Sequence, residues 1–190
     1  MSKLKEYTLK ECIDKIIDYR GKTPEKMNGS WKNKGVRVIS ALNVHDGFID
    51  NEDQIRYVDK DVYKKWMTEE IERNDLLLAS EGASLGENCI WDSDEKIVLG
   101  QRLYAIRTNS ELLDPWFFAM YMQSKKFKLQ IQQVSTGSTV FGISQPVLMN
   151  LKILLPNIQV QKKIGKVFKD IRNRIIANNK INNNLCYNNA

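Results

Sequence analysis

The fold of this chain is decided by the stretch Leu151-Lys152-Ile153-Leu154-Leu155-Pro156-Asn157. A short apolar run, rich in residues that favour strands, stops at Pro156, and the hydrophobic period then changes from that of a strand to that of a helix. Asn157 can cap the helix, because its side chain can accept a hydrogen bond from a backbone N–H of the first turn. We therefore predict a strand up to Pro156, followed by a long helix.

The predicted C-terminal helix carries a seam of residues at alternating steps of four and three, the spacing of a coiled coil. A helix from Asn157 to Leu185 would extend on the order of 40 Å, longer than a small domain needs for its own core. We therefore expect the helix to pair with a partner helix, with asparagines in the seam fixing its register. The alternative is that the helix frays into a polar tail after Ile176, because the asparagines that follow are poor helix formers. The seam residues are Ile164, Phe168, Ile171, Ile175, Asn178, Asn182 and Leu185.

Length and composition fit one globular domain with an appendage. The chain has 190 residues, of which 42% are hydrophobic and 27% charged, as in ordinary soluble proteins. We place a globular domain at 1–156 and the helix at 157–190. The sequence has no long apolar run that could span a membrane and no apolar signal core in Met1–Glu6, so we expect a cytoplasmic protein. The three widely spaced cysteines fit neither a metal site nor a disulfide framework and are expected to be reduced thiols.

The net charge of +6 is concentrated in the C-terminal segment. Residues 157–190 contain seven basic residues and one acidic residue, Asp170, which leaves 22 basic and 22 acidic residues in 1–156. A neutral body can bind DNA only through a local basic face. The basic residues of the C-terminal helix can equally be a solvated surface, which is the more common meaning of such a charge run.

The remaining pattern predicts an α+β domain, a mixed body with a twisted β-sheet and short helices, followed by the long coiled-coil helix. Thr8-Leu9-Lys10-Glu11 forms a capping box for a helix with Leu9, Ile13 and Ile16 on one face. Asp59 and Asp114 are expected to cap two further helices, the second running to about Val134. The other predicted elements are strands at 36–39, 76–78, 97–99 and 102–107, a hairpin at 44–49 that turns at Asp46-Gly47, an exposed loop at 79–87, a short helix from 143–146, and a strand at 151–155.

Three polar loops are candidates for nucleic-acid contacts. In 18–24, Arg20 and Lys22 flank a glycine, and Pro24 pushes Thr23 toward extended geometry, so both cations are expected to point outward. The segment 100–102 contains Gln101 and Arg102, and 135–139 is rich in hydroxyl groups that suit phosphate oxygens. The alternative for each loop is a solvated connection without function.

Taken in order, five segments resemble the specificity subunit of type I restriction-modification enzymes. They are Arg20–Pro24, Gly100–Arg102, Ser135–Thr139, Ile143-Ser144 and Leu148–Pro156. In that family a target recognition domain reads half of a bipartite DNA sequence, and a spacer helix sets the distance to a second such domain. The usual subunit has two domains and two helices, so the resemblance implies a half-subunit that pairs with another copy through its helix, with twofold symmetry.

The resemblance departs from the family at one place and leaves the system type open. At Pro156–Gln161 the family more often has a second proline and an acidic residue before the glutamine, so the start of the helix is in question. Target recognition domains of single-chain restriction enzymes look similar, so the type of restriction system is open.

The resemblance implies a non-catalytic subunit without cofactor or metal, whose partners are double-stranded DNA, methyltransferase subunits, a restriction subunit and a second copy. Sequence reading would use loops in the major groove, with phosphate contacts for position and base-edge contacts for specificity. The candidate DNA contacts are Arg20, Lys22, Thr23, Gln101, Arg102, Gly137, Ser138 and Thr139.

Motifs for catalysis are weak. The only histidine, His45, has no matched nucleophile and is expected to be a turn residue. The segment 114–117 lacks the second proline of an amino-methyltransferase motif, whereas Asp92, Asp94 and Lys96 have the composition of a metal nuclease site. Two alternatives therefore stay open: a small metal-dependent nuclease, and a coiled-coil protein-interaction module without DNA specificity.

Overall fold

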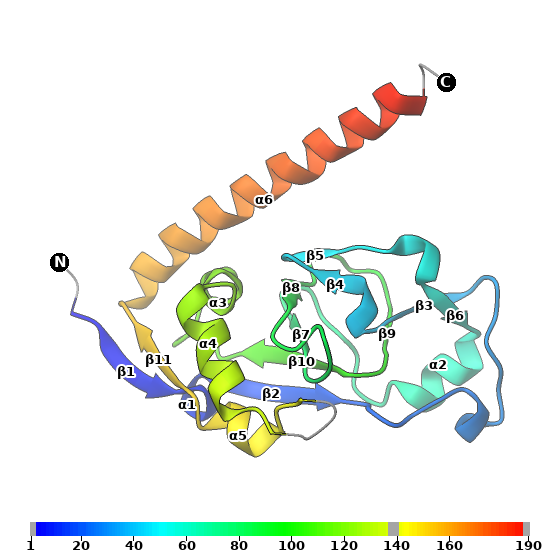
Figure 1. Ribbon diagram of the computed structural model, residues 1–190, viewed down its shortest axis with the longest axis horizontal. Helices are drawn as coiled ribbons and strands as arrows, with labels where there is room; N and C mark the ends of the chain where they lie inside the picture. The colour runs from blue at the N-terminus through cyan, green and yellow to red at the C-terminus, as the bar shows by residue number, and fades with distance from the viewer. Residues whose placement is uncertain (1–2, 137–140, 188–190) are drawn as a thin grey trace.

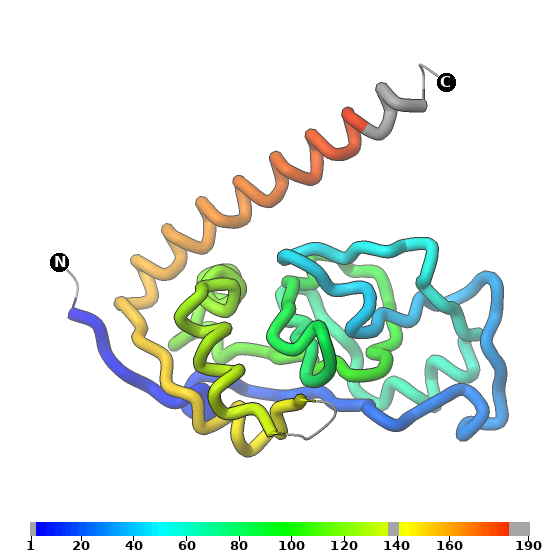
Figure 2. Tube along the Cα trace, in the orientation of Figure 1, coloured from blue at the N-terminus to red at the C-terminus, as the bar shows by residue number. Residues whose placement is uncertain are grey.

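The stretch 151–157 contains a strand, and a long helix begins directly after it, as predicted. A computed structural model describes residues 3–136 and 141–187, and for 183–187 it describes the helix backbone alone (Figures 1 and 2). The strands are β1 Lys5–Thr8, β2 Ile13–Asp18, β3 Val36–Ile39, β4 Val44–His45, β5 Phe48–Ile49, β6 Arg56–Val58, β7 Leu76–Ala79, β8 Asn88–Ile90, β9 Val98–Leu99, β10 Leu103–Thr108 and β11 Lys152–Leu155. The α-helices are α1 Leu9–Cys12, α2 Lys60–Trp66, α3 Pro115–Met122, α4 Lys125–Val134, α5 Gln145–Met149 and α6 Ile158–Tyr187, and short 3-10 helices occur at Glu25–Met27, Ala41–Asn43 and Glu52–Gln54.

A four-stranded antiparallel sheet, in the order β2-β10-β7-β8, lies at the centre of the body. Its strand β7 is buried on both faces: Leu76 and Leu78 face one hydrophobic core, and Leu77 and Ala79 face another. Burial on both faces explains the uninterrupted apolar run of this strand, since side chains alternate across a sheet. The two cores are called here the helix-side core, which contains α3 and α4, and the groove-side core, which contains β3 and Trp66.

Smaller sheets complete the body. In one of them β3 lies between β6, which is antiparallel to it, and β9, which is parallel to it. Strands β1 and β11 pair with each other and bring the two ends of the body together (Figure 1). The predicted hairpin is confirmed as β4–β5, with positive φ angles at Asp46 and Gly47, as its two-residue turn requires. The α+β class is therefore confirmed, and none of the described helices is long and apolar enough to cross a membrane.

The predicted helix through Leu9, Ile13 and Ile16 is wrong beyond its first turn. The capping box of Thr8 and Glu11 is present, but α1 ends at Cys12 and the chain continues as β2. Strand β2 pairs along its length with β10, where Ile17 lies opposite Ala105. Isoleucines pack well on a pleated surface and are less favourable in helices, so the pairing with β10 outweighs a four-residue spacing.

The single helix predicted from Asp114 to Val134 is two helices. Asp114 caps α3 as expected, but Ser124 caps a new helix by accepting a hydrogen bond from the N–H of Phe127 at 3.3 Å. The break lets Phe118 and Phe127 enter the same helix-side core from two directions. The aromatic residues Phe117, Phe118 and Phe127 are therefore core residues.

The loop at 79–87 is not exposed as predicted. Ser80 is fully buried and most of the loop is half-buried. The segment from 141 covers it: the N–H of Ile143 donates to the carbonyl of Ser80 at 2.9 Å, and the N–H of Gly82 donates to that of Phe141 at 2.8 Å. This loop therefore joins β7 to β8 and is partly covered by a segment that is distant in sequence.

The first turns of α6 are docked on α3. The buried side chain of Gln161 accepts from the N–H of Asp114 at 3.1 Å and donates to the carbonyls of Leu112 and Pro156 at 3.0 and 2.9 Å. At Gly165 the helices come so close that a Cβ would lie 2.8 Å from the backbone nitrogen of Phe117. One turn further on, the ring of Phe168 lies 6.4 Å from that of Trp116.

Two cations extend the contact between α6 and the body. Lys169 pairs with Asp92 at 3.3 Å, and the Nε of Arg172 donates to the carbonyl of Gly47 at 3.2 Å. The guanidinium of Arg172 also lies over the rings of Phe48 and Trp116, and burial lowers the pKa of Arg172. Beyond this point the helix leaves the body (Figure 1).

We predict that Gly165→Ala loosens this docking. The added methyl would also lie 2.3 Å from an Asp114 oxygen, so α6 must shift away from α3. Overpacking of this kind costs about 1–3 kcal/mol, and each kcal/mol lowers Tm by about 2–4 °C in a chain of this size. Thermal unfolding and hydrogen exchange of α6 measure the effect. The control is Lys166→Ala, on the exposed side of the same turn; equal Tm values for the two variants would contradict the prediction.

Candidate nucleic-acid interface

Two of the three predicted loops are joined to each other. The side chain of Gln101 lies between them: its Oε1 accepts from the N–H of Gly21 at 3.3 Å, and its Nε2 donates to the carbonyl of Lys22 at 2.7 Å. The amide of Gln101 is therefore occupied on both sides by backbone groups. It holds the 18–24 loop in place, a role that the sequence did not indicate.

Arg20 is exposed, as predicted, but its guanidinium is bound to a carboxylate of the protein. Its guanidinium donates to both carboxylate oxygens of Asp18, with Nε–Oδ1 at 2.9 Å and Nη2–Oδ2 at 2.8 Å, and lies over the ring of Tyr104. Gln145 of α5 donates to the same carboxylate at 3.1 Å. Burial tends to raise the pKa of Asp18, but the hydrogen bonds from Arg20 and Gln145 outweigh it and hold that pKa below its ordinary value. The carboxylate of Asp18, at the end of β2, therefore binds both Arg20 and Gln145 and links β2 to α5.

Lys22 is also turned toward the protein. Its Nζ donates to the carbonyl of Trp66 at 2.7 Å and lies 4.3 Å from the centre of the Tyr19 ring. Burial lowers the pKa of this amine. Thr23 follows it in a half-buried position. Both cations of this loop are therefore bound to other groups of the protein, and these bonds stabilise the loop itself.

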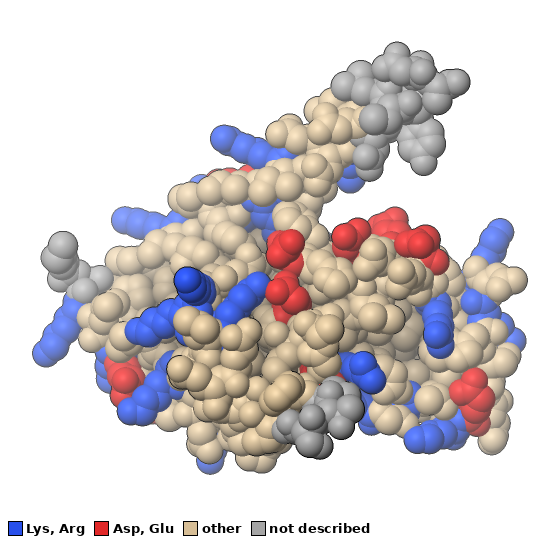
Figure 3. All heavy atoms as spheres, viewed as in Figure 1, with Lys and Arg blue, Asp and Glu red and all other residues tan. Residues whose placement is uncertain are grey.

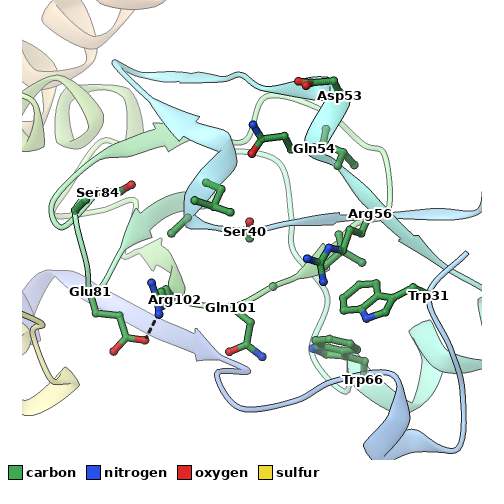
Figure 4. A pocket seen from close by; sticks show the side chains of 16 residues that line it. Trp31, Ser40, Asp53, Gln54, Arg56, Trp66, Glu81, Ser84, Gln101 and Arg102 are labelled. Atoms are coloured by element: carbon green, nitrogen blue, oxygen red, sulfur yellow. Dashed lines mark ion pairs between the residues drawn. The ribbon is translucent and has the colours of Figure 1, made fainter. Parts of the chain in front are cut away.

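Arg102 is the predicted cation that stays open. It is exposed and sits in a turn with φ 62°, and its ion pair within the part of the chain that the structure describes is a loose one with Glu81, at 3.7 Å. It lines a groove of about 830 Å³ together with Gln101 and Glu81. Figure 4 shows Arg102 and Glu81 on one side of this groove.

The other side of the groove holds residues that sequence analysis missed. The guanidinium of Arg56 lies 4.9 Å from the centre of the Trp31 ring, and that ring meets Trp66 edge-on (Figure 4). Gln54 lines the groove nearby. Only the pairing of β6 with β3 could have revealed Arg56, because it lies opposite Val38, which also lines the groove.

Gly137, Ser138 and Thr139 lie outside the described residues. The residues that flank them are described: Thr136 and Gly142 pair with each other, and Gly142 also bridges to Glu81. Thr136 and Gly142 therefore lie close to Glu81, on the Arg102 side of the groove.

The predicted helix seam divides into two parts. Ile164 and Phe168 pack against the helix-side core of the same chain, so they are not free for a partner helix. Ile171 and Ile175 are 52% and 41% exposed, and Asn178 and Asn182 are exposed as well. The side chain of Leu185 lies outside the described residues. Two apolar residues that the predicted seam omits, Val167 and Ile181, are 58% and 55% exposed.

The groups proposed for a nuclease are engaged with cations of the same surface. Asp92 and Asp94 pair with Arg73 at 2.7 and 2.8 Å, and Lys96 pairs with Glu70. Within 3–136 and 141–182, no three histidine, cysteine or acidic side chains are placed to hold a metal ion. This arrangement gives the nuclease alternative no geometric support.

Charge is unevenly distributed around the groove. Figure 3 shows acidic side chains gathered over the segment that runs from the β4–β5 hairpin to the 3-10 helix Glu52–Gln54. The exposed acids of that segment are Asp46, Asp50, Glu52 and Asp53. A polyanion is therefore repelled from this edge and attracted to the arginine-bearing sides.

The chain belongs to the family described as type I restriction modification DNA specificity domain, whose model matches residues 1–186. One relative is the type I restriction enzyme MjaVIII specificity subunit of Methanocaldococcus jannaschii, 29% identical over 145 residues. The match covers 74% of this chain but only 34% of that subunit, so the chain spans about a third of its relative.

Solved structures agree on the fold. The S subunit of a type I restriction-modification system from M. genitalium superposes with a TM-score of 0.63 at 16% identity, over 93% of this chain and 41% of that one. The HsdS subunit from Thermoanaerobacter tengcongensis gives a TM-score of 0.62 at 16% identity, over 92% and 38% of the two chains. The family resemblance seen in the sequence is therefore confirmed.

We predict that Gln101→Ala opens the 18–24 loop. Two hydrogen bonds of about 0.5–1.5 kcal/mol each are lost, so the open population rises roughly tenfold. Limited trypsin digestion should cleave after Arg20 and Lys22 faster by about that factor, because cleavage follows the open population.

The matched control for this experiment is Gln54→Ala, which removes another groove amide that does not hold the loop. Cleavage after the exposed Lys34 should stay constant in both variants. Unchanged cleavage after Arg20 and Lys22 in Gln101→Ala would show that Gln101 does not hold the loop.

Proposed function

We propose that this chain is the sequence-reading part of a type I restriction-modification specificity subunit that binds double-stranded DNA. The observation that carries the proposal is the family match over residues 1–186, nearly the whole chain. The groove supports it, because Arg56 and Arg102, from two separate segments, line it beside the acids Asp53 and Glu81, and among the described residues neither arginine has a tight carboxylate partner. A specificity subunit needs no catalytic group of its own, so methylation and cleavage belong to partner modification and restriction subunits.

The proposed reading mechanism divides the work between charges and loops. Cations beside the groove position the phosphate backbone, and residues of the adjoining loops, including 137–139, meet base edges. The body of the chain, 1–156, is neutral overall, so long-range attraction to DNA is weak and depends on these local charges.

The proposal includes pairing with a second copy through α6. Val167, Ile171, Ile175 and Ile181 form an exposed apolar strip on a helix that leaves the body. Such a strip is stabilised when another helix covers it. Two copies joined in this way would read a split, inverted target, and the helix length would set its gap. The same helices would hold the modification subunits.

Selection of bound duplexes from a randomised DNA pool tests the proposal, with the chain alone and with a matching modification subunit. We expect enrichment of an inverted repeat with a fixed gap. A single half-site would support DNA reading but contradict the pairing. No enrichment in either condition would overturn the DNA-reading proposal in favour of a protein-interaction module.

For the pairing, we predict that Ile171→Asp together with Ile175→Asp abolishes self-association. Two charges in an apolar helix interface cannot be paired there, so the dimer loses stability. Light scattering should give the mass of one chain for the variant and of two chains for the wild type. Asn173→Asp, an exposed change on another side of the helix, is the control. A wild-type mass of one chain at all concentrations would overturn the pairing.

A further inference from the structure

We infer that the groove between Arg56 and Arg102 seats the sugar-phosphate backbone of one DNA strand, with the two guanidinium groups contacting phosphates from opposite sides. This inference rests on the proposed function and names the part of the surface that bears affinity. It assigns Arg56, which no sequence pattern indicated, and it removes Gln101 from the set of DNA contacts.

The shape of the site favours a backbone over base edges. Base edges lie at the floor of a DNA groove and are reached by protruding loops or helices, whereas the sugar-phosphate backbone is a ridge. The site here is a hollow of about 830 Å³ whose walls are formed by the 40–42, 81–84 and 100–102 segments, by 53–55 with the start of β6, and by Trp31 and Trp66. A ridge fits a hollow, so the backbone is the part of a duplex that this site can accept.

The two arginines of the walls suit phosphate, and they lie beside two acids that also line the groove, Asp53 and Glu81. The guanidinium of Arg56 makes no ion pair within the described residues, and its stacking on Trp31 holds it in place before a ligand binds. Arg102 faces it with a carboxylate partner at 3.7 Å, too far for a strong hydrogen bond. Each can therefore donate to a phosphate oxygen without losing a tight internal partner.

Sheet register keeps Arg56 on this wall. In the pairing of β6 with β3, Arg56 lies opposite Val38, and Val38 lines the groove. Trp31 is fixed beside it, because the N–H of Lys32 donates to the carbonyl of Tyr57 at 2.9 Å. Arg37 is the next residue along β3 and points to the opposite face of the sheet, where it pairs with Glu95 at 3.1 Å. Arg37 is therefore a matched arginine outside the groove.

The test measures DNA affinity of the full chain as a function of salt for Arg56→Ala, Arg102→Ala, the double variant and Arg37→Ala. The probes are a duplex selected from the random pool and a duplex of unrelated sequence. Each groove variant should bind both duplexes about tenfold or more weakly, since a hydrogen bond to a charged group is lost. Each should reduce the slope of log K against log salt by about 0.9, and the double variant by about twice that. Arg37→Ala should match the wild type.

Arg56→Lys and a repeated pool selection separate a phosphate contact from a base contact. A lysine contacts phosphate as a point charge, so Arg56→Lys should keep the salt slope, and all groove variants should keep the wild-type base preferences. Relaxed preference at one position would overturn the inference by making that arginine a base reader. An unchanged slope in folded Arg56→Ala, judged by thermal unfolding, would place the groove outside the interface.

Failure of this inference is distinguishable from failure of the proposed function. If the wild type selects a sequence while the groove variants bind as it does, only the groove assignment fails. If the wild type binds neither probe, DNA reading itself fails.

Discussion

The structure depends on the buried amide of Gln161, which joins the start of the long helix to the start of α3. Its carbonyl oxygen and its NH₂ group are both satisfied by backbone groups, from the segment 112–114 and from Pro156. A buried amide left without partners costs roughly 1–3 kcal/mol, so this side chain favours one placement of α6 over all others. Gly165 and Phe168 then extend the contact along the helix. Through this joint the direction of α6 is tied to the body that carries the groove.

The basic residues of the candidate interface divide by what surrounds them. Arg20 and Lys22 are bound to a carboxylate and a carbonyl of the protein itself, and they give the 18–24 loop its shape. Among the described residues, Arg56 has no carboxylate partner and Arg102 has one at 3.7 Å. Net charge therefore says little about where a polyanion binds. The number of internal partners that each cation already has is the more informative quantity.

Much of the fold could be predicted from local signals. The strand that ends at Pro156, the cap at Asn157, the Asp46-Gly47 turn and the caps at Asp59 and Asp114 are determined by nearby residues, and they are found as expected. Predictions failed where distant residues decide. Ile13–Asp18 becomes a strand because β10 lies beside it.

The candidate site was predicted only in part, for the same reason. The order of motifs in the sequence indicated the loops 18–24 and 100–102 as candidate DNA contacts, and in the structure Gln101 joins them. It could not show that Arg20 would meet Asp18, or that Arg56 would share a sheet face with Val38. The sequence assigned Phe168 to a contact with a partner helix, but its ring packs on Trp116 of the same chain, a contact that no helical period reveals.

The division of the body into two cores separates changes in the groove loops from changes in the packing between α3 and α6. Loops around the groove rest on the groove-side core, whereas α3 and the docked part of α6 belong to the helix-side core. The two meet across one sheet, whose strand β7 contributes alternate side chains to each. Substitutions at groove positions that do not contact α5, α6 or the segment 141–143 can therefore accumulate without disturbing the packing of α6 on α3. A lineage of such chains could acquire new targets while conserving the architecture of its assembly.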